Sequence, residues 1–190
     1  MIKMENREIV GTIIGLSTPF EFTFAVSPGK VNLQDFVSVD VETGGGKTAR
    51  AWAKVSRIER FNPLLPMESG HEIAAMGTEA VSTVVSLSRE MVTAKANILG
   101  MESSDGQMAP LTYPVKPASS VYIPPPDDVV KLLAGDIPPH RVLNVGKLRG
   151  REVDIAIDGH FTVSRHVAIF AMTGAGKSWT CRTILEELIK

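Results

Sequence analysis

The most constraining feature of the chain is a short glycine-rich loop that separates an apolar run from a helical pattern. Residues 166–171 are almost continuously apolar, which is typical of a β-strand buried on both faces. Residues 177–190 change to a helical period, with one broad apolar face formed by Cys181, Ile184, Leu185, Leu188 and Ile189. A strand that leads through a tight loop into a helix is the repeating unit of α/β domains, so these residues predict the opening of one.

The loop itself, residues 171–178, reads Ala-Met-Thr-Gly-Ala-Gly-Lys-Ser and ends in the Gly-Lys-Ser of the P-loop pattern. Ala171 stands where the first glycine of that pattern usually is, a position that mainly requires a permissive turn. In a P-loop, backbone N–H groups (here from Gly174 to Ser178) curl around a β-phosphate, and the helix N-terminus adds partial positive charge. The Lys177 ammonium reaches the β- and γ-phosphates, and the Ser178 hydroxyl holds Mg²⁺. The sequence therefore predicts binding of ATP with Mg²⁺. An accidental lysine in a glycine turn is the weaker interpretation, because the flanking elements fit a P-loop.

A second Gly-Lys-Thr sequence, within residues 43–48, lacks this setting. Residues 49–55, which follow it, alternate polar and apolar side chains like a strand and offer no helix N-terminus to an anion. We therefore interpret residues 43–48 as a hairpin loop.

Residues 1–60 alternate polar and apolar side chains in short stretches, which are broken by turns rich in Gly, Pro and Ser. The apolar positions at a spacing of two fall in residues 9–13, 20–26, 36–41 and 51–58. Because only alternate positions are strongly apolar, one face of each strand should pack inward. This pattern predicts a small antiparallel barrel or sandwich.

The next segment is less regular. Residues 72–90 fit either a helix or a strand, with residues 72–76 favouring a helix and residues 82–85 favouring a strand. We expect the first part to be helical. Residues 91–99 predict another strand.

Prolines concentrate in residues 110–139, which contain eight of the twelve. Their fixed φ predicts an extended segment. Within it, Asp127 should cap a short helix that Gly135 stops. Short strands are then predicted at residues 142–145 and 153–157.

We place the domain boundary in this proline-rich segment. Residues 1–122 are expected to form the barrel domain, and residues 123–145 a proline-rich connector with a short helix. Residues 146–190 are expected to begin the α/β domain.

Composition and charge exclude several classes of protein. With 44% hydrophobic and 22% charged residues, the chain is neither disordered nor fibrous. A net charge of -1 leaves no global positive field for nucleic acid, so DNA would be bound by local patches or by an assembly. One cysteine excludes an intramolecular disulfide framework, and the four histidines show no metal-ligand spacing. No apolar stretch is long enough to span a membrane and no signal-peptide core is present, so we expect no membrane association and a cytoplasmic protein.

Hydrolysis of ATP requires more than phosphate binding. A second strand must bring one acidic residue to Mg²⁺ and another to orient the attacking water. Asp154 and Asp158 precede the predicted loop strand and lack that context. A single strand–loop–helix unit also cannot bury its own faces. We therefore expect the first part of a longer ATPase, with at most weak nucleotide binding and negligible hydrolysis by these residues alone.

An N-terminal β-barrel, a proline-rich connector, and residues 163–169 (Val-Ser-Arg-His-Val-Ala-Ile) leading into residues 172–178 (Met-Thr-Gly-Ala-Gly-Lys-Ser) form a familiar order of parts. This order resembles the HerA family of archaeal and bacterial DNA translocases, in the HerA–FtsK branch of the P-loop ATPases. The resemblance implies the fold class β + α/β, in which a small antiparallel HerA-type barrel precedes the start of a RecA-like P-loop domain.

The resemblance also implies a function. A homo-hexameric ring would hydrolyse ATP and move double-stranded DNA through its pore, as a helicase or translocase in DNA end resection and repair. A NurA-like nuclease would dock on the barrel. The residues that match the family's phosphate-binding positions are Thr173, Gly174, Ala175, Gly176, Lys177 and Ser178. Lys177 would be catalytic, Ser178 would bind Mg²⁺, and Thr180 would border the nucleotide. The remaining catalytic and pore residues of the family would lie beyond Lys190.

Four other residues have a role either in the site or in packing. Arg165 either senses a phosphate, within or between subunits, or is a surface arginine at a strand start. Trp179 covers the nucleotide, contacts a neighbour or packs in the core. We expect Cys181 to be a packing residue on the helix. For Trp52, barrel packing or a surface contact is favoured over stacking on a base.

Two other functions stay open. The chain could act by itself as a barrel-type interaction module that docks a nuclease. It could also belong to a conjugation- or secretion-type ATPase that moves protein or DNA. Capture of a partner by residues 1–140 alone favours the first, and stimulation of ATP turnover by a peptide rather than DNA favours the second.

Overall fold

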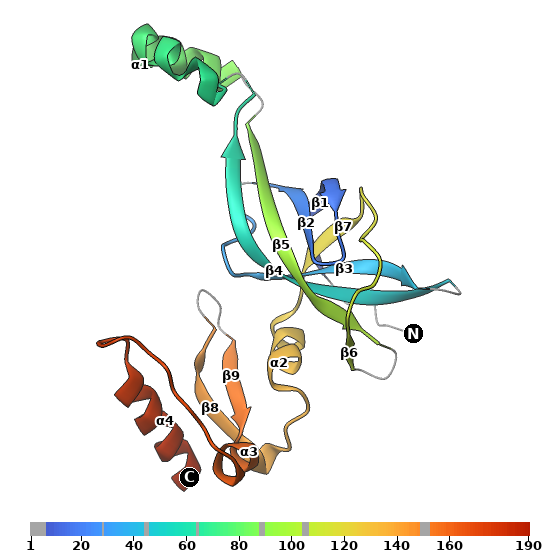
Figure 1. The fold of residues 1–190 in the computed structure, drawn as a ribbon, viewed down its shortest axis with the longest axis vertical. Helices are drawn as coiled ribbons and strands as arrows, with labels where there is room; N and C mark the ends of the chain where they lie inside the picture. Colours follow the sequence, from blue (N-terminus) through green and yellow to red (C-terminus); the bar gives the residue numbers. More distant parts are fainter. Residues whose placement is uncertain are drawn as a thin grey trace. The chain divides into compact units, whose positions relative to one another are not determined.

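The computed structural model describes residues 7–27, 29–43, 46–63, 65–87, 90–103, 107–148 and 153–190. The chain divides into two compact units, Met1–Pro124 and Pro125–Lys190 (Figure 1).

The first unit is a closed six-stranded antiparallel barrel. Around the barrel the strand order is β2-β1-β7-β3-β4-β5, and pairing of β2 with β5 closes it. A short strand, β6, pairs with the C-terminal end of β5 on the edge opposite β4. The strands are β1 (Glu8–Ser17), β2 (Glu21–Val26), β3 (Phe36–Thr43), β4 (Lys47–Phe61), β5 (Met91–Glu102), β6 (Met108–Ala109) and β7 (Ser120–Ile123). The predicted fold class, a barrel followed by the start of an α/β domain, is confirmed.

The barrel core follows the alternation in the sequence. Along β2, Phe22, Phe24 and Val26 are buried while the residues between them are only half-buried, as expected for a strand with one inward face. The rings of Phe22 and Phe24 lie with their centroids 5.8 Å apart. Phe20 has the same parity but precedes the strand, and it is 78% exposed.

The second Gly-Lys-Thr sequence lies in a hairpin, as predicted. Strands β3 and β4 pair antiparallel on either side of it, and Thr43 is opposite Lys47. Residues 44 and 45 lie outside the described residues. No helix begins here, so this loop has no helical N–H groups to offer to an anion.

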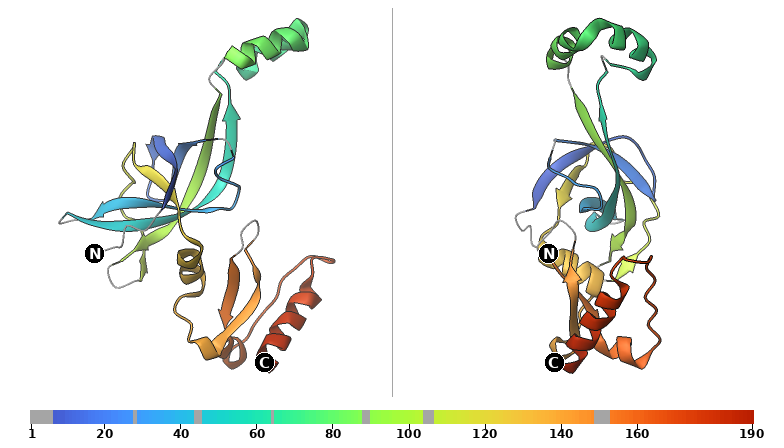
Figure 2. Two further views of the ribbon diagram at one scale, coloured as in Figure 1. Left: turned by 180° about the vertical axis from the view of Figure 1, so that it is seen from behind. Right: turned by 90° about the vertical axis from the view of Figure 1, so that its left-hand side faces the viewer.

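The strands β4 and β5 continue past the barrel and are connected through helix α1 (Gly70–Leu87), as Figures 1 and 2 show. A one-turn helix, η1 (Met67–Ser69), precedes α1. Gly77 has a φ of 77°, which interrupts the helix. Residues 82–85 are helical despite their β-branched composition, so the strand alternative for residues 72–90 is wrong over residues 72–87. Propensity is a weak signal that local context overrides.

The second unit is built on one antiparallel strand pair. Strand β8 (Val142–Lys147) pairs with β9 (Asp154–Asp158), and a bulge interrupts the register between Asn144 and Gly146. Helix α2 (Pro126–Ala134) packs on β9, and helix α4 (Lys177–Ile189) packs on β8. Two short helices, η2 (Pro139–Arg141) and α3 (Gly159–Ser164), precede β8 and follow β9.

The start of α2 differs from the prediction. Pro125 occupies the N-cap position and Pro126 begins the helix, so Asp127 lies inside the first turn and caps nothing with its side chain. Proline at the first helical position has a suitable φ and no N–H to satisfy, which explains the earlier start. The predicted end is confirmed, because Gly135 terminates the helix with a φ of 67°.

The predicted buried strand at residues 166–171 is wrong for this structure. These residues pair with no strand among the described residues, and Val167 and Phe170 are 53% and 93% exposed. A buried parallel strand needs neighbours on both edges and helices on both faces. The strands of this unit, β8 and β9, pair only with each other.

None of the helices among the described residues is long and apolar enough to cross a membrane.

Candidate functional site

The chain enters the Gly-Lys-Ser loop (residues 171–178) from a firmly capped turn. One oxygen of Asp158, Oδ1, accepts the backbone N–H groups of His160 at 2.8 Å and Phe161 at 3.3 Å, which caps α3. Gly159 is buried, and a Cβ there would lie 3.1 Å from Leu143 Cγ. Because glycine permits this close approach, the start of α3 lies against β8. The segment that leads to the loop therefore begins at a well-packed position.

The loop itself is a tight turn followed by a helix. The N–H of Ala175 donates to the carbonyl of Met172 at 3.1 Å, and Gly174 has a φ of 83°. Positive φ at the third residue is the requirement of a type II turn. Gly176 is left-handed as well, with a φ of 87° and a ψ of 16°, and it is the N-cap of α4. Both glycines therefore occupy conformations that other residues adopt at a cost.

Helix α4 begins at Lys177 and offers its first N–H groups to a ligand. Thr180 is the first residue whose N–H reaches a helical carbonyl, that of Gly176 at 3.0 Å, and its hydroxyl donates to the same oxygen at 3.3 Å. The N–H groups of Lys177, Ser178 and Trp179 therefore have no partner within the helix. The partial positive charge of the helix lies at this end.

The side chains of Lys177 and Ser178 are exposed beside these N–H groups. The Lys177 ammonium makes no ion pair with a described residue. A phosphate at this end of the helix would therefore meet backbone N–H groups and an ammonium, which are suitable hydrogen-bond donors for a triphosphate. The Ser178 hydroxyl beside them would supply an oxygen ligand for Mg²⁺.

Three residues near the loop, Arg165, Trp179 and Cys181, are exposed in the structure. The Arg165 guanidinium lies 5.5 Å from the centre of the Phe161 ring, on the exposed side of α3. Trp179 is 71% exposed, so the core-packing interpretation is wrong for this structure. Cys181 is exposed, and its predicted packing role is also wrong here. Among the described strands helix α4 packs mainly on β8, and no residue of the helix is buried.

The attachment of α4 to β8 depends on Glu187. Its Oε2 accepts the backbone N–H of Asn144 at 3.1 Å, and its Oε1 accepts a hydrogen bond from the Lys190 ammonium. These two bonds, the one from Lys190 first, hold the pKa of the Glu187 carboxyl below its ordinary value. Glu187 is not among the residues of the predicted apolar face. The only signal in favour of a contact was its position beside the apolar face, at Leu188.

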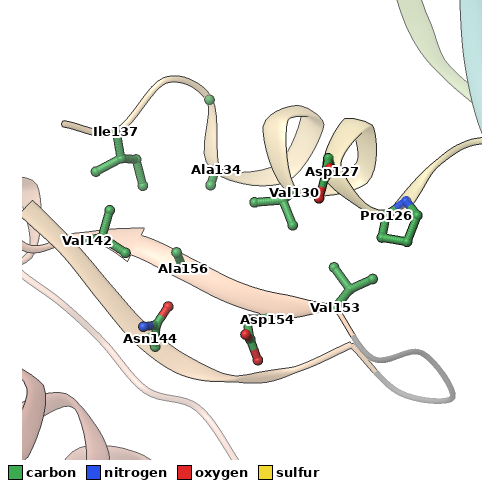
Figure 3. Close-up of a pocket in the computed structure, with 11 residues that line it drawn as sticks. Pro126, Asp127, Val130, Ala134, Ile137, Val142, Asn144, Val153, Asp154 and Ala156 are labelled. Atoms are coloured by element: carbon green, nitrogen blue, oxygen red, sulfur yellow. The ribbon is translucent and has the colours of Figure 1, made fainter. Parts of the chain in front are cut away.

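A cleft of about 330 Å³ lies elsewhere in the second unit, between α2 and the β8–β9 pair. Figure 3 shows Val130 and Val153 pointing into this space, with Asp127 near the start of α2 and Asn144 on β8. None of the predicted phosphate-binding residues lines it. The cleft and the loop are therefore separate features.

On the barrel, Trp52 packs as predicted. It is 3% exposed, and its indole N–H donates to Glu102 at 3.4 Å. The Arg50 guanidinium lies 5.4 Å from the centre of its ring. Trp52 is therefore not available for stacking on a base.

Comparison with known proteins finds relatives that are described as helicases. Residues 143–190 match the family model described as "Helicase HerA, central domain". A "Probable helicase MJECL08" of Methanocaldococcus jannaschii is 27% identical over 97% of this chain and 35% of its own length. The "DNA double-strand break repair helicase HerA" of Pyrococcus furiosus is 26% identical over 97% of this chain and 32% of its own length. The second unit of this chain therefore resembles the central domain of HerA helicases, and the whole chain is similar to helicases of this kind.

The matches to these relatives include the barrel as well as the loop, because they extend over nearly all of this chain. The chain spans about a third of the length of the curated relatives that it matches. The predicted resemblance to the HerA family is thus confirmed.

Proposed function

We propose that the Gly-Lys-Ser loop of this chain binds the phosphates of ATP, with Lys177 as a catalytic residue and Ser178 as a ligand of Mg²⁺. The observation that supports this most is the geometry at Gly176. Its left-handed conformation starts α4 at Lys177, so that helical N–H groups and the ammonium lie at one place. Thr173 to Ser178 would surround the phosphates, and Thr180 and Trp179 would border the rest of the nucleotide. Arg165 would sense the phosphate from α3.

We further propose that this site powers movement of double-stranded DNA. The relatives include a probable helicase and a DNA double-strand break repair helicase, which supports the DNA substrate. In this proposal a homo-hexamer forms a ring in the cytoplasm, and a NurA-like nuclease docks on the barrel during DNA end resection. A ring would also explain how a chain of net charge -1 binds DNA, since six such chains can gather their basic groups in one channel.

The three predicted segments of the chain would then have different roles. We propose that residues 1–122 form the docking platform and that residues 123–145 link it to the motor. Residues 146–190 would open the RecA-like motor domain. Hydrolysis would need acidic residues from a second strand, which we do not assign to any residue of this chain.

Removal of the Lys177 ammonium tests the nucleotide site. We expect Lys177→Ala to weaken binding of a fluorescent ATP analogue with Mg²⁺ by about tenfold or more, since charged hydrogen bonds are the strong ones. Lys131→Ala, on the exposed side of α2 in the same unit, is the matched control and should bind normally. Equal affinity of the Lys177 variant and the control would contradict the proposal.

The DNA proposal needs a separate assay. We expect these 190 residues by themselves to hydrolyse ATP at a negligible rate. A polypeptide of the full length of the relatives should hydrolyse ATP faster when double-stranded DNA is added. Stimulation by a peptide and not by DNA would instead favour a secretion-type ATPase.

A further inference from the structure

An exposed indole lies in the first turn of α4. Trp179 is the third residue of the helix, and 71% of it is exposed. The other tryptophan of the chain, Trp52, is buried and donates its N–H to Glu102. Of these two indoles, only that of Trp179 therefore has a ring surface available to a ligand.

Arg182 contacts this indole and is itself paired with Glu186. The Arg182 guanidinium lies over the Trp179 ring, 5.8 Å from its centre. Its Nε in turn donates to Glu186 Oε1 at 2.6 Å. The three residues are spaced by three and four, so they line one side of the helix. Because guanidinium ions pack on aromatic faces, one face of the ring is covered and the other stays open.

The direction of the side chain points to the ligand. In an α-helix the Cα–Cβ bonds tilt toward the N-terminus, so a side chain covers the turn before its own Cα. By this rule we expect the indole of Trp179 to lie beside the turn that starts at Gly176, where Lys177 and the N–H groups without helical partners lie. A nucleotide whose phosphates occupy that end must place its ribose and base beside the first turn of α4.

We propose that Trp179 stacks on the base of the bound nucleotide and thereby makes the loop prefer a nucleoside triphosphate over a bare polyphosphate. This inference rests on the proposed nucleotide site. Stacking needs only a flat ring, so it tolerates every base and is strongest for purines. The affinity should accordingly fall in the order ATP and GTP, then CTP and UTP, then tripolyphosphate.

Calorimetric titration of the whole chain with MgATP and with magnesium tripolyphosphate separates base from phosphate. We expect Trp179→Ala to lose about tenfold in affinity for MgATP, in line with the value of one base–aromatic stack, and to bind tripolyphosphate like the wild type. Trp179→Phe should recover most of the affinity for MgATP. Tyr113→Ala removes an aromatic residue that is 81% exposed on the barrel unit, and this control should change neither affinity.

The outcomes distinguish the stacking role of Trp179 from the proposed phosphate site. If wild type binds both ligands and Trp179→Ala binds MgATP equally well, the stacking role is wrong and the phosphate site stands. An equal loss for both ligands also overturns stacking, because the indole would then support the loop itself. If neither ligand binds the wild type, the proposed nucleotide site fails first. In wild type, acrylamide quenching of Trp179 should fall on addition of MgATP but not of tripolyphosphate, a readout that needs no variant to fold.

Discussion

Single glycines determine how closely the strands of the barrel approach. A Cβ built on Gly11 of β1 would lie 2.3 Å from the carbonyl oxygen of Ala25 and 2.7 Å from Phe24 Cδ2. The first of these atoms belongs to the backbone of the paired strand, so it cannot move aside without disturbing the sheet. Gly11 is therefore required by packing, whereas Gly174 and Gly176 have open space around them and are required by their positive φ.

Substitution of Gly11 tests this packing. We expect Gly11→Ala to lower the free energy of unfolding of the barrel by about 1–3 kcal/mol, the usual cost of forcing extra atoms into a packed site. Urea unfolding followed by circular dichroism measures the change. Gly70→Ala is the control, because no atom lies within 4 Å of a Cβ there and the residue already has helical angles. An unchanged urea midpoint for Gly11→Ala would show that β1 and β2 can separate without cost.

At the scale of elements, α4 is attached to β8 through a carboxylate, and this makes the attachment sensitive to pH. The pKa of Glu187 is lowered in the folded chain, first by the hydrogen bond from Lys190 and then by the N–H of Asn144. A carboxyl group with a lowered pKa stabilises the fold above its unfolded pKa, which is about 4.3 for glutamate. That contribution is lost as the pH falls through the lowered folded value.

Hydrogen exchange of the Asn144 amide measures this attachment. We expect its protection to fall as the pH drops below about 4, with the intrinsic exchange rate taken into account. Glu187→Gln keeps an oxygen acceptor for that N–H, so its protection should persist without the same dependence on pH. Equal pH dependence in wild type and Glu187→Gln would mean that another group controls the contact.

How far the sequence predicts an element depends on whether the partners of that element are local. The alternation in β2 and the helical period of α4 are local, and both elements form as predicted. Strand β7 lies in the proline-rich segment, and no strand was predicted there. It completes the barrel by pairing with β1 and β3, which are distant in the chain. The apolar run at residues 166–171 predicted burial, but burial depends on neighbouring strands that no local pattern supplies.

The candidate site shows the same division. The Gly-Lys-Ser spacing predicts the left-handed glycines and the helix start, because both are consequences of the loop's own sequence. The contact between Trp179 and Arg182 also follows from helical spacing, although the pattern alone gave no reason to choose it over core packing. The bond from Asn144 to Glu187 joins residues 43 apart in the chain, and nothing in either segment predicts it.

At the scale of the whole molecule, the two compact units should be separable. The barrel closes on itself through the pairing of β2 with β5, and its core cluster comes entirely from the first unit. We expect a fragment of residues 1–124 to fold by itself, with a cooperative thermal transition close to that of the barrel in the whole chain. A fragment without a cooperative transition would mean that the barrel depends on the second unit.

The most direct test of the central claim, that the Gly-Lys-Ser loop binds a triphosphate, is a crystal structure with Mg²⁺ and a non-hydrolysable ATP analogue at saturating concentration. We predict the β-phosphate within hydrogen-bond distance of the N–H groups that follow Gly176, the Lys177 ammonium on the β- and γ-phosphates, and Mg²⁺ on the Ser178 hydroxyl. A loop that stays empty, or a nucleotide bound only in the cleft between α2 and the β8–β9 pair, would contradict the claim.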